Sequence, residues 1–252
     1  MELNQYTYMF ESEDRHWWYV GNHEHFLALL KSKNILRPGL RVLDAGCGTG
    51  KWLEILKKKA QINETGIDFQ EVAIEYARTR GDMNLMQGDV NKKMFEQDSF
   101  DLITCFDVLC NAKVDDRKAL ENFNSYLSEN GHLLLTLPAY KFMLSTHDKA
   151  VHTGKRYTRK QVKYLLKEAG FESVRSTYTV SLLFSLAFLK RIFDKLSHKD
   201  PLEHNEVKIP HPIINTLFLA VMRIENFILS LIPLPFGLSV VVLAKKKTNE
   251  TH

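Results

Sequence analysis

The chain has 252 residues, of which 44% are hydrophobic and 25% are charged, and its formal net charge is +4. This length and composition fit one globular domain with additions. The net positive charge is too small to indicate nucleic acid binding by itself. The three cysteines, Cys47, Cys105 and Cys110, show no disulfide or zinc spacing, which favours a reducing cytosol. The first residues lack the basic start and apolar run of a signal peptide.

Predicted helices and strands alternate along most of the chain. The patterns predict helices over residues 13–33, 51–59, 70–79, 115–128 and 158–168, the last capped by Thr158. They predict strands over residues 41–45, 64–67, 83–87, 100–106, 131–137 and 171–180. Such alternation predicts βαβ units and a mostly parallel sheet, and apolar strands such as residues 133–137 indicate that both of its faces are covered.

A long apolar segment, residues 181–235, interrupts the alternation before a final predicted strand at 238–245. Its second helix, at 212–232, has apolar residues at helical spacing, but Arg223 and Glu225 argue against a membrane-spanning helix. We therefore divide the chain into an N-terminal helical cap (1–40), an α/β core (41–180), an apolar helical insertion (181–235), and a last core strand with a basic tail (236–252).

A glycine-rich loop, VLDAGCGTG at residues 42–50, follows the first predicted strand. Gly46, Gly48 and Gly50 allow a sharp turn and a close approach to a ligand, but glycines alone would suit several nucleotides. Asp44 separates these alternatives, because a carboxylate there would repel a pyrophosphate and attract an ammonium or a sulfonium. The GxGxG spacing also differs from the dinucleotide motif GxGxxG.

Two further acids follow the next two predicted strands. Asp68 can accept hydrogen bonds from both hydroxyls of a ribose, and Phe69 could cover an adenine face. Asp89 can accept from the adenine amino group, while the Val90 N–H can meet a ring nitrogen. The sequence therefore predicts a cationic adenosyl ligand.

The glycine loop and the three acids, in this order and spacing, resemble the class I S-adenosylmethionine-dependent methyltransferases. The resemblance implies an α/β, Rossmann-like three-layer sandwich with a mostly parallel seven-stranded sheet whose last strand is antiparallel. The N-terminal helix and the helical insertion before the last strand would be additions to it. The segment FDVL, residues 106–109, matches the family's segment that lines the methyl-donor pocket. Many relatives continue with an acid and a histidine, where this chain has Cys110 and Asn111.

The implied cofactor is S-adenosyl-L-methionine. Its predicted contacts are Asp44, Ala45, Gly46, Cys47, Gly48, Gly50, Asp68, Phe69, Asp89, Val90, Phe106 and Tyr19. Tyr19 belongs to the run HWWY at residues 16–19, which resembles a bacterial and archaeal subgroup of the family. There Tyr19 or Trp17 would close the pocket against water, although plain packing against the sheet is equally open.

The segment after the fifth predicted strand contains several candidate bases and resembles the same subgroup, with its PAY, HD, H and RYT pattern. We predict His147 as the general base, oriented by Asp148, and Tyr157 as a further catalytic candidate. The alternative is that His147 and Asp148 only fix the loop by hydrogen bonds. The spacing of His147, Asp148 and His152 matches no strong ligand signature, so no metal is predicted. The predicted substrate pocket comprises Trp17, Asn111, Tyr140, His152 and Arg156.

The sequence thus predicts a cytoplasmic methyltransferase for a small-molecule or lipid-like acceptor, which it methylates in line, at oxygen rather than nitrogen. The apolar insertion, with basic residues between 190 and 199, fits peripheral docking at the inner membrane face or a lid; a homodimer interface or an ordinary cap is the alternative. An RNA or protein methyltransferase would need a basic groove or recognition domain, and neither is evident. A catalytically silent, membrane-associated partner protein is the remaining alternative.

Overall fold

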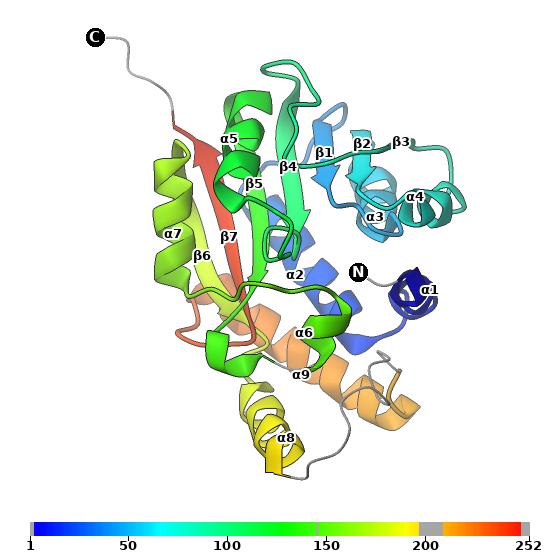
Figure 1. Cartoon of the computed structure of the whole chain (residues 1–252), viewed down its shortest axis with the longest axis vertical. Helices are drawn as coiled ribbons and strands as arrows, with labels where there is room; N and C mark the ends of the chain where they lie inside the picture. The colour runs from blue at the N-terminus through cyan, green and yellow to red at the C-terminus, as the bar shows by residue number, and fades with distance from the viewer. Residues whose placement is uncertain (1–2, 145, 197–208, 248–252) are drawn as a thin grey trace.

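The computed structural model describes residues 3–144, 146–196 and 209–247. Seven strands form one sheet in the order β3-β2-β1-β4-β5-β7-β6 (Figure 1). They are β1 (Arg41–Ala45), β2 (Asn63–Asp68), β3 (Asn84–Gln87), β4 (Phe100–Phe106), β5 (Leu127–Pro138), β6 (Phe171–Thr179) and β7 (Ser239–Lys246). β1 to β5 pair in parallel, and β7 is antiparallel to both β5 and β6. The predicted sheet is confirmed.

Helices cover both faces of the sheet. The described ones are α1 (Leu3–Ser12), α2 (Trp17–Ser32), α3 (Lys51–Ala60), α4 (Glu71–Arg78), α5 (Asp116–Tyr126), α6 (Thr146–Ala150), α7 (Arg159–Glu168), α8 (Phe184–Leu196) and α9 (Pro212–Leu231), with a short 3-10 helix, η1, at Lys141–Met143. α5 and α7 share one buried cluster with the sheet, and α2, α3 and α4 share the other. Neighbouring strand residues point into different clusters, as Val42 and Leu43 do. The three-layer sandwich is confirmed.

The helix boundaries follow local capping. Thr158 begins α7 with a capping box, as predicted, and its side chain pairs with the N–H of Gln161. The helix predicted at residues 13–33 begins later, because His16 is the N-cap of α2 and its Nδ1 accepts from the Trp18 N–H at 3.2 Å. The preceding helix, α1, was not predicted. The helix predicted to reach residue 128 ends at Tyr126, because Leu127 already pairs with Phe100 in the sheet.

The insertion before the last strand forms α8 and α9, as predicted. α9 crosses α2 closely: a Cβ added at Gly21 would lie 2.8 Å from the Cβ of Met222. α1 and α2 lie across the carboxyl ends of the parallel strands (Figure 1). In the described part of the chain, α9 alone is long and apolar enough to cross a membrane, and only 17% of its most apolar window is buried.

Candidate active site

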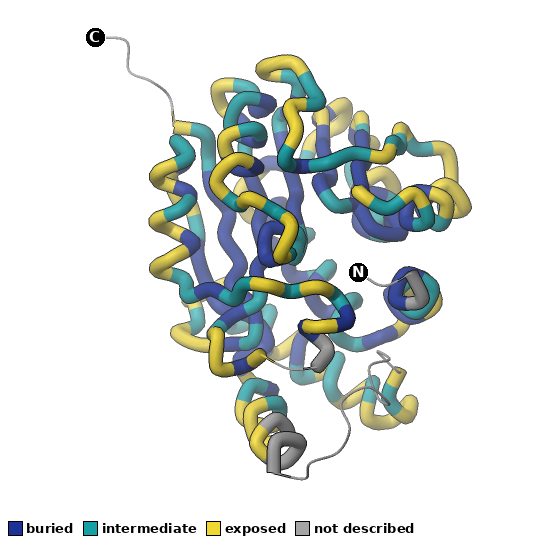
Figure 2. The backbone as a smooth tube through the Cα atoms, viewed as in Figure 1, coloured by how far each residue is buried: buried dark blue, intermediate teal, exposed yellow. Residues whose placement is uncertain are grey.

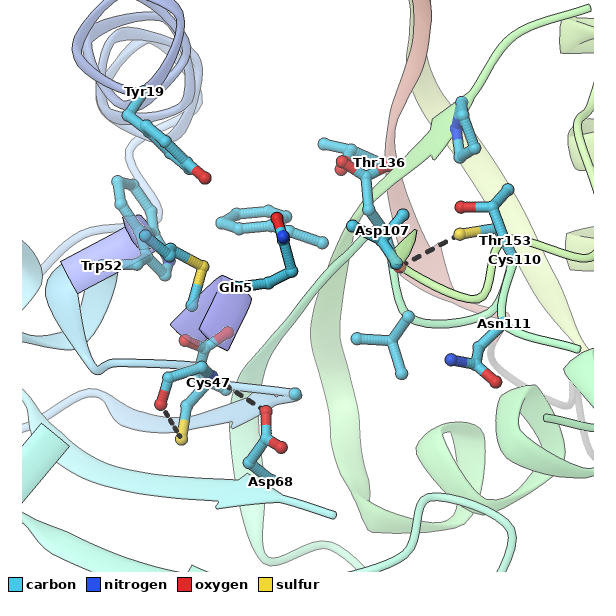
Figure 3. Close-up of a pocket in the computed structure, with 18 of the residues that line it drawn as sticks. Gln5, Tyr19, Cys47, Trp52, Asp68, Asp107, Cys110, Asn111, Thr136 and Thr153 are labelled. Carbon is cyan, nitrogen blue, oxygen red and sulfur yellow. Dashed lines mark hydrogen bonds between the residues drawn. The ribbon is translucent and has the colours of Figure 1, made fainter. Parts of the chain in front are cut away.

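A cavity of about 740 Å³ lies at the carboxyl edge of the sheet. Its walls come from the loops after β1, β2, β3 and β4, from the segment after β5, and from α1 and α2. Figure 3 shows side chains from these segments, including Gln5 of α1, Tyr19 of α2 and Asp68 of β2, around the same space. Ligands of parallel sheets bind at this edge, so the cavity is the candidate active site.

The glycine loop after β1 is confined by its neighbours. Gly46 has a φ of 89°, and a Cβ on it would lie 2.1 Å from Cγ2 of Val108. Gly48 has a φ of 53°, and a Cβ on it would lie 2.7 Å from Cε of Met9 in α1. Both positions favour glycine for their positive φ, and Gly46 also for space, because Val108 would clash with any side chain there.

Asp44 is almost fully buried at the end of β1. Its Oδ1 accepts a hydrogen bond from Oγ1 of Thr104 at 2.6 Å. Burial is the main cause that raises the pKa of Asp44 to about 7; the hydrogen bond from Thr104 opposes the rise, and the nearby charge of Asp68 adds to it. A buried carboxylate with one neutral donor favours a positively charged ligand, which would stabilise its ionised form.

Asp68 at the end of β2 holds the glycine loop and the N-terminus together. Its Oδ2 accepts from the Gly48 N–H at 3.0 Å, and its Oδ1 accepts from the Gln70 N–H at 3.0 Å. The hydroxyl of Tyr6 in α1 donates to the same Oδ1 at 3.3 Å. Burial raises the pKa of Asp68 above its usual value. The carboxylate lines the cavity, where it can accept ligand hydroxyls.

α1 closes one side of the cavity, and sequence reasoning missed it. The Arg80 guanidinium lies 2.5 Å from a carboxylate oxygen of Glu13, and both side chains are buried. Thr49 of the glycine loop also donates to Glu13, while Arg80 packs 4.5 Å from the Phe10 ring centroid. The signal was available, because Tyr6, Met9, Phe10 and Glu13 repeat at helical spacing.

The predicted cofactor residues mostly meet at the cavity. Ten of the twelve line it: Asp44, Gly46, Cys47, Gly48, Asp68, Phe69, Asp89, Val90, Phe106 and Tyr19. Ala45 is buried within β1, and Gly50 is the N-cap of α3, so neither is among the lining residues. Phe69 stands at the border of the cavity and is 59% exposed.

The predicted substrate-pocket residues, together with the catalytic candidates Asp148 and Tyr157, divide into two groups. Trp17, Asn111, Asp148, His152 and Arg156 line the cavity. Tyr140 stacks on Tyr178, 5.3 Å between ring centroids, and is not a lining residue. Tyr157 is not one either, because its hydroxyl donates to Asp116 at 2.7 Å and to the Leu109 carbonyl at 3.1 Å.

Asp148 and Arg156 form a buried ion pair beside the cavity. Nε and Nη2 of Arg156 donate to the two carboxylate oxygens of Asp148 at 2.9 and 3.1 Å, and Nη1 donates to the Ala139 carbonyl at 2.8 Å. These bonds anchor the segment after β5 to the sheet. His147 belongs to α6, but its side chain lies outside the described residues, so its predicted role stays a prediction.

Asp107 belongs to the FDVL segment, which was expected at the methyl-donor pocket, but it was not itself predicted as a site residue; it follows β4 in the cavity wall (Figure 3). Its φ is 56°, a conformation that non-glycine residues seldom adopt and that occurs at functional sites. Its Oδ1 is buried and has no hydrogen-bond partner in the described structure. Burial raises its pKa to about 6, although the charge of Arg156 and a hydrogen bond from Thr136 oppose this.

The lining suits S-adenosylmethionine. Asp44, Asp68 and Asp107 are carboxylates that can meet cationic groups or hydroxyls, and the glycine loop admits close backbone contact. Within the described residues, no cluster of His, Cys, Asp and Glu side chains could hold a metal ion.

Comparison with known proteins agrees with this geometry. Residues 36–170 match the model of a family described as a methyltransferase domain. A demethylmenaquinone methyltransferase of Staphylococcus aureus is 32% identical over 143 residues, which are 51% of this chain and 59% of that protein. The chain thus matches less than two thirds of that relative's length.

Two solved structures share the fold. A Galdieria sulphuraria protein, described provisionally as a sarcosine dimethylglycine methyltransferase, has a TM-score of 0.64 and 14% identity over 91% of this chain and 87% of its own. A Haemonchus contortus phosphoethanolamine N-methyltransferase, in complex with S-adenosyl-L-methionine, has a TM-score of 0.57 and 18% identity over 88% of this chain and 52% of its own. With the family match over more than half its length, this chain belongs to the S-adenosylmethionine-dependent methyltransferases.

Proposed function

We propose that this methyltransferase acts on an apolar, lipid-like small molecule at a membrane surface. One observation carries the proposal: a single cavity joins the acidic cofactor residues to an aromatic wall formed by Trp17, Trp18 and Phe26. The Staphylococcus aureus relative, named for demethylmenaquinone, supports an apolar acceptor. A peripheral position at the inner membrane face would give such an acceptor access to a cytoplasmic enzyme.

In the proposed complex, Asp44 and the glycine loop hold the methionine end of the cofactor, and Asp68 accepts from its ribose hydroxyls. Asp89 and Val90 face the adenine, and Phe69 covers it. The sulfonium methyl is already activated, so alignment of the acceptor in line with the carbon–sulfur bond supplies most of the acceleration. The HWWY and PAY…HD…RYT segments support membership of this chain in the bacterial and archaeal subgroup of the family.

The proposed acceptor atom is a hydroxyl oxygen, whose proton must leave as the methyl carbon bonds to the oxygen and the carbon–sulfur bond breaks. Two groups could take that proton. His147 remains the base predicted from sequence, and the unpaired Oδ1 of Asp107 is a second candidate that the geometry adds. A pKa near 6 would leave Asp107 ionised and able to accept a proton at neutral pH.

The test supplies S-adenosylmethionine labelled in its methyl group together with total lipid extract, total RNA or total protein of a bacterial cell. We expect label in the organic phase of the lipid reaction and background counts in the other two. Label in RNA or protein would replace the proposal with the macromolecular alternative. No transfer, together with no binding of S-adenosylhomocysteine in calorimetry, would favour the catalytically silent protein.

A further inference from the structure

α9 exposes an apolar stripe on its outward side in addition to the apolar residues that it buries, Met222 and Leu229. Six positions at spacings of three and four residues form what we call the outer stripe: Ile213, Leu217, Ala220, Ile224, Phe227 and Leu231. All six are exposed, and the five large side chains are 58–73% exposed. A helix on a globular domain normally turns such a stripe toward the core.

Some polar side chains of α9 face the protein, among them Asn215 and Glu225. Asn215 accepts from the Trp17 N–H at 2.9 Å and donates to the Arg15 carbonyl at 2.8 Å. Glu225 is 1% exposed and accepts from the N–H groups of Ser181 and Leu182 at 2.7 and 2.8 Å. These directed bonds fix the rotation of α9 about its axis, so the outward position of the stripe is a property of the fold.

The apolar surface extends beyond one helix. On α8 and the turn before it, Leu182, Leu186, Leu189 and Ile192 are 40–59% exposed. Phe142 of η1, which contacts Phe188 of α8, and Phe236 add to this area. Figure 2 shows exposed residues in the described parts of both helices, at the end of the molecule away from the C-terminus.

The segments that form this face are rich in basic residues. Exposed Lys141 precedes Phe142, and the sequence of the carboxyl half of α8 contains Lys190, Arg191 and Lys195 against one acid, Asp194. Exposed apolar residues in segments of basic sequence are typical of helices that bind a bilayer with anionic headgroups.

We infer that the α8–α9 face, defined by the outer stripe and the exposed apolar residues of α8, docks on an anionic lipid bilayer. Trp17 connects this face to the reaction, because it lines the cavity and packs 5.4 Å from Phe218 of α9. Docking would therefore place the aromatic wall next to the membrane. The bilayer contact stands on the polarity of α9, but its purpose, delivery of the acceptor, rests on the proposed function.

The test measures co-sedimentation of the full chain with vesicles of phosphatidylglycerol and phosphatidylcholine. We expect wild-type binding, and a loss of roughly tenfold or more in the double variant Leu217→Glu/Phe227→Glu, because two charges would enter the apolar layer. Tyr164→Glu, a matched change at an exposed aromatic residue of α7, should bind like the wild type. Equal affinity for S-adenosylhomocysteine would show that all variants are folded.

Two results would overturn the inference: no vesicle binding by the wild type, or equal binding by the double variant. A wild-type dimer in light scattering that Leu217→Glu/Phe227→Glu converts to a monomer, without vesicle binding, would assign the face to a second copy. Methylation of detergent-dispersed lipid extract separates the two proposals. If methylation persists without vesicle docking, the membrane location fails and the lipid-like acceptor stands; if docking occurs without methylation, the proposed acceptor class fails.

Discussion

The cofactor end of the cavity and the α8–α9 face place their polar groups in opposite ways. At the cofactor end, carboxylates such as Asp44 and Glu13 are buried and held by directed hydrogen bonds. On the α8–α9 face, large apolar side chains are exposed, and Glu225 and Asn215 point inward. Directed bonds select one ligand of defined shape, whereas apolar area recognises a medium without fixed geometry. The same chain thus contains a specific site and a nonspecific surface.

The largest effect on the free energy of unfolding is expected at the buried ion pair of Arg80 with Glu13, beside the cofactor end of the cavity. Arg80→Ala would leave Glu13 buried without its cation and should lower the free energy of unfolding by about 3–5 kcal/mol. Arg78→Ala is the matched control, because Arg78 pairs with Glu71 at the exposed surface and should cost at most about 1 kcal/mol. Urea unfolding measures both. Equal losses would show that α1 is not held by this pair.

Asp44 should make cofactor binding depend on pH. Its folded pKa of about 7 lies above the ordinary value, so its protonated form stabilises the ligand-free fold at low pH, and this contribution is lost as pH rises through 7. A bound cation favours the ionised form instead. Affinity for S-adenosylmethionine should therefore rise about tenfold per unit as pH increases toward 7, and binding should release protons.

Calorimetry in buffers of different ionisation enthalpy measures this proton release. Asp44→Asn should bind more weakly and with a flatter pH dependence. An unchanged slope in that variant would assign the titration to another group, such as Glu13, whose pKa is also raised to about 7 and which accepts a hydrogen bond from Thr49 of the glycine loop.

Asp68→Ala should weaken binding of S-adenosylhomocysteine by about 1.5–3 kcal/mol, because charge-assisted hydrogen bonds to the ribose would be lost. Asp82→Ala, an exposed change near β3, serves as the control. Wild-type affinity in Asp68→Ala would mean that the ribose lies elsewhere in the cavity.

The smallest effect on the free energy of unfolding is expected for substitutions on the α8–α9 face. Leu217→Ser and Ile224→Ser should change the free energy of unfolding by less than about 0.5 kcal/mol, because both side chains are already exposed. Leu229→Ala on the inward side should cost about 2–5 kcal/mol. Chemical denaturation of the three variants compares them. A large loss for the outer pair would mean that the stripe is covered in solution, and the contrast between the two regions would fail.

The sequence predicted the sheet because its information is local. Apolar strands, the Thr158 cap and the glycine loop each depend on a few neighbouring residues, and the acids after β1, β2 and β3 meet because parallel strands end at one edge. Asp107 was missed because its value lies in a positive φ and an unpaired oxygen, which no spacing reveals. The predicted pairing of Asp148 with His147 did not anticipate Arg156, eight residues away in sequence, which occupies both carboxylate oxygens.

The orientation of α9 is a second feature that could not be predicted from the sequence. Its spacing from Ile213 to Leu231 predicts an amphipathic helix, but not which side faces the core. Glu225 decides the orientation through the N–H groups of Ser181 and Leu182, which lie more than 40 residues away in the chain. Such a contact exists only once the fold is formed.

The pairing of Thr179 with Ser239 at the ends of β6 and β7 has a consequence for how this enzyme could change over evolution. The whole insertion leaves and re-enters the sheet between two residues that are already neighbours, so the pairing does not depend on its length or composition. The surface that we propose for membrane docking can therefore be lengthened, exchanged or lost by mutation while β1 to β4 and their acids keep their places. If that proposal holds, membrane docking and methyl-donor use are separately inheritable traits in this architecture.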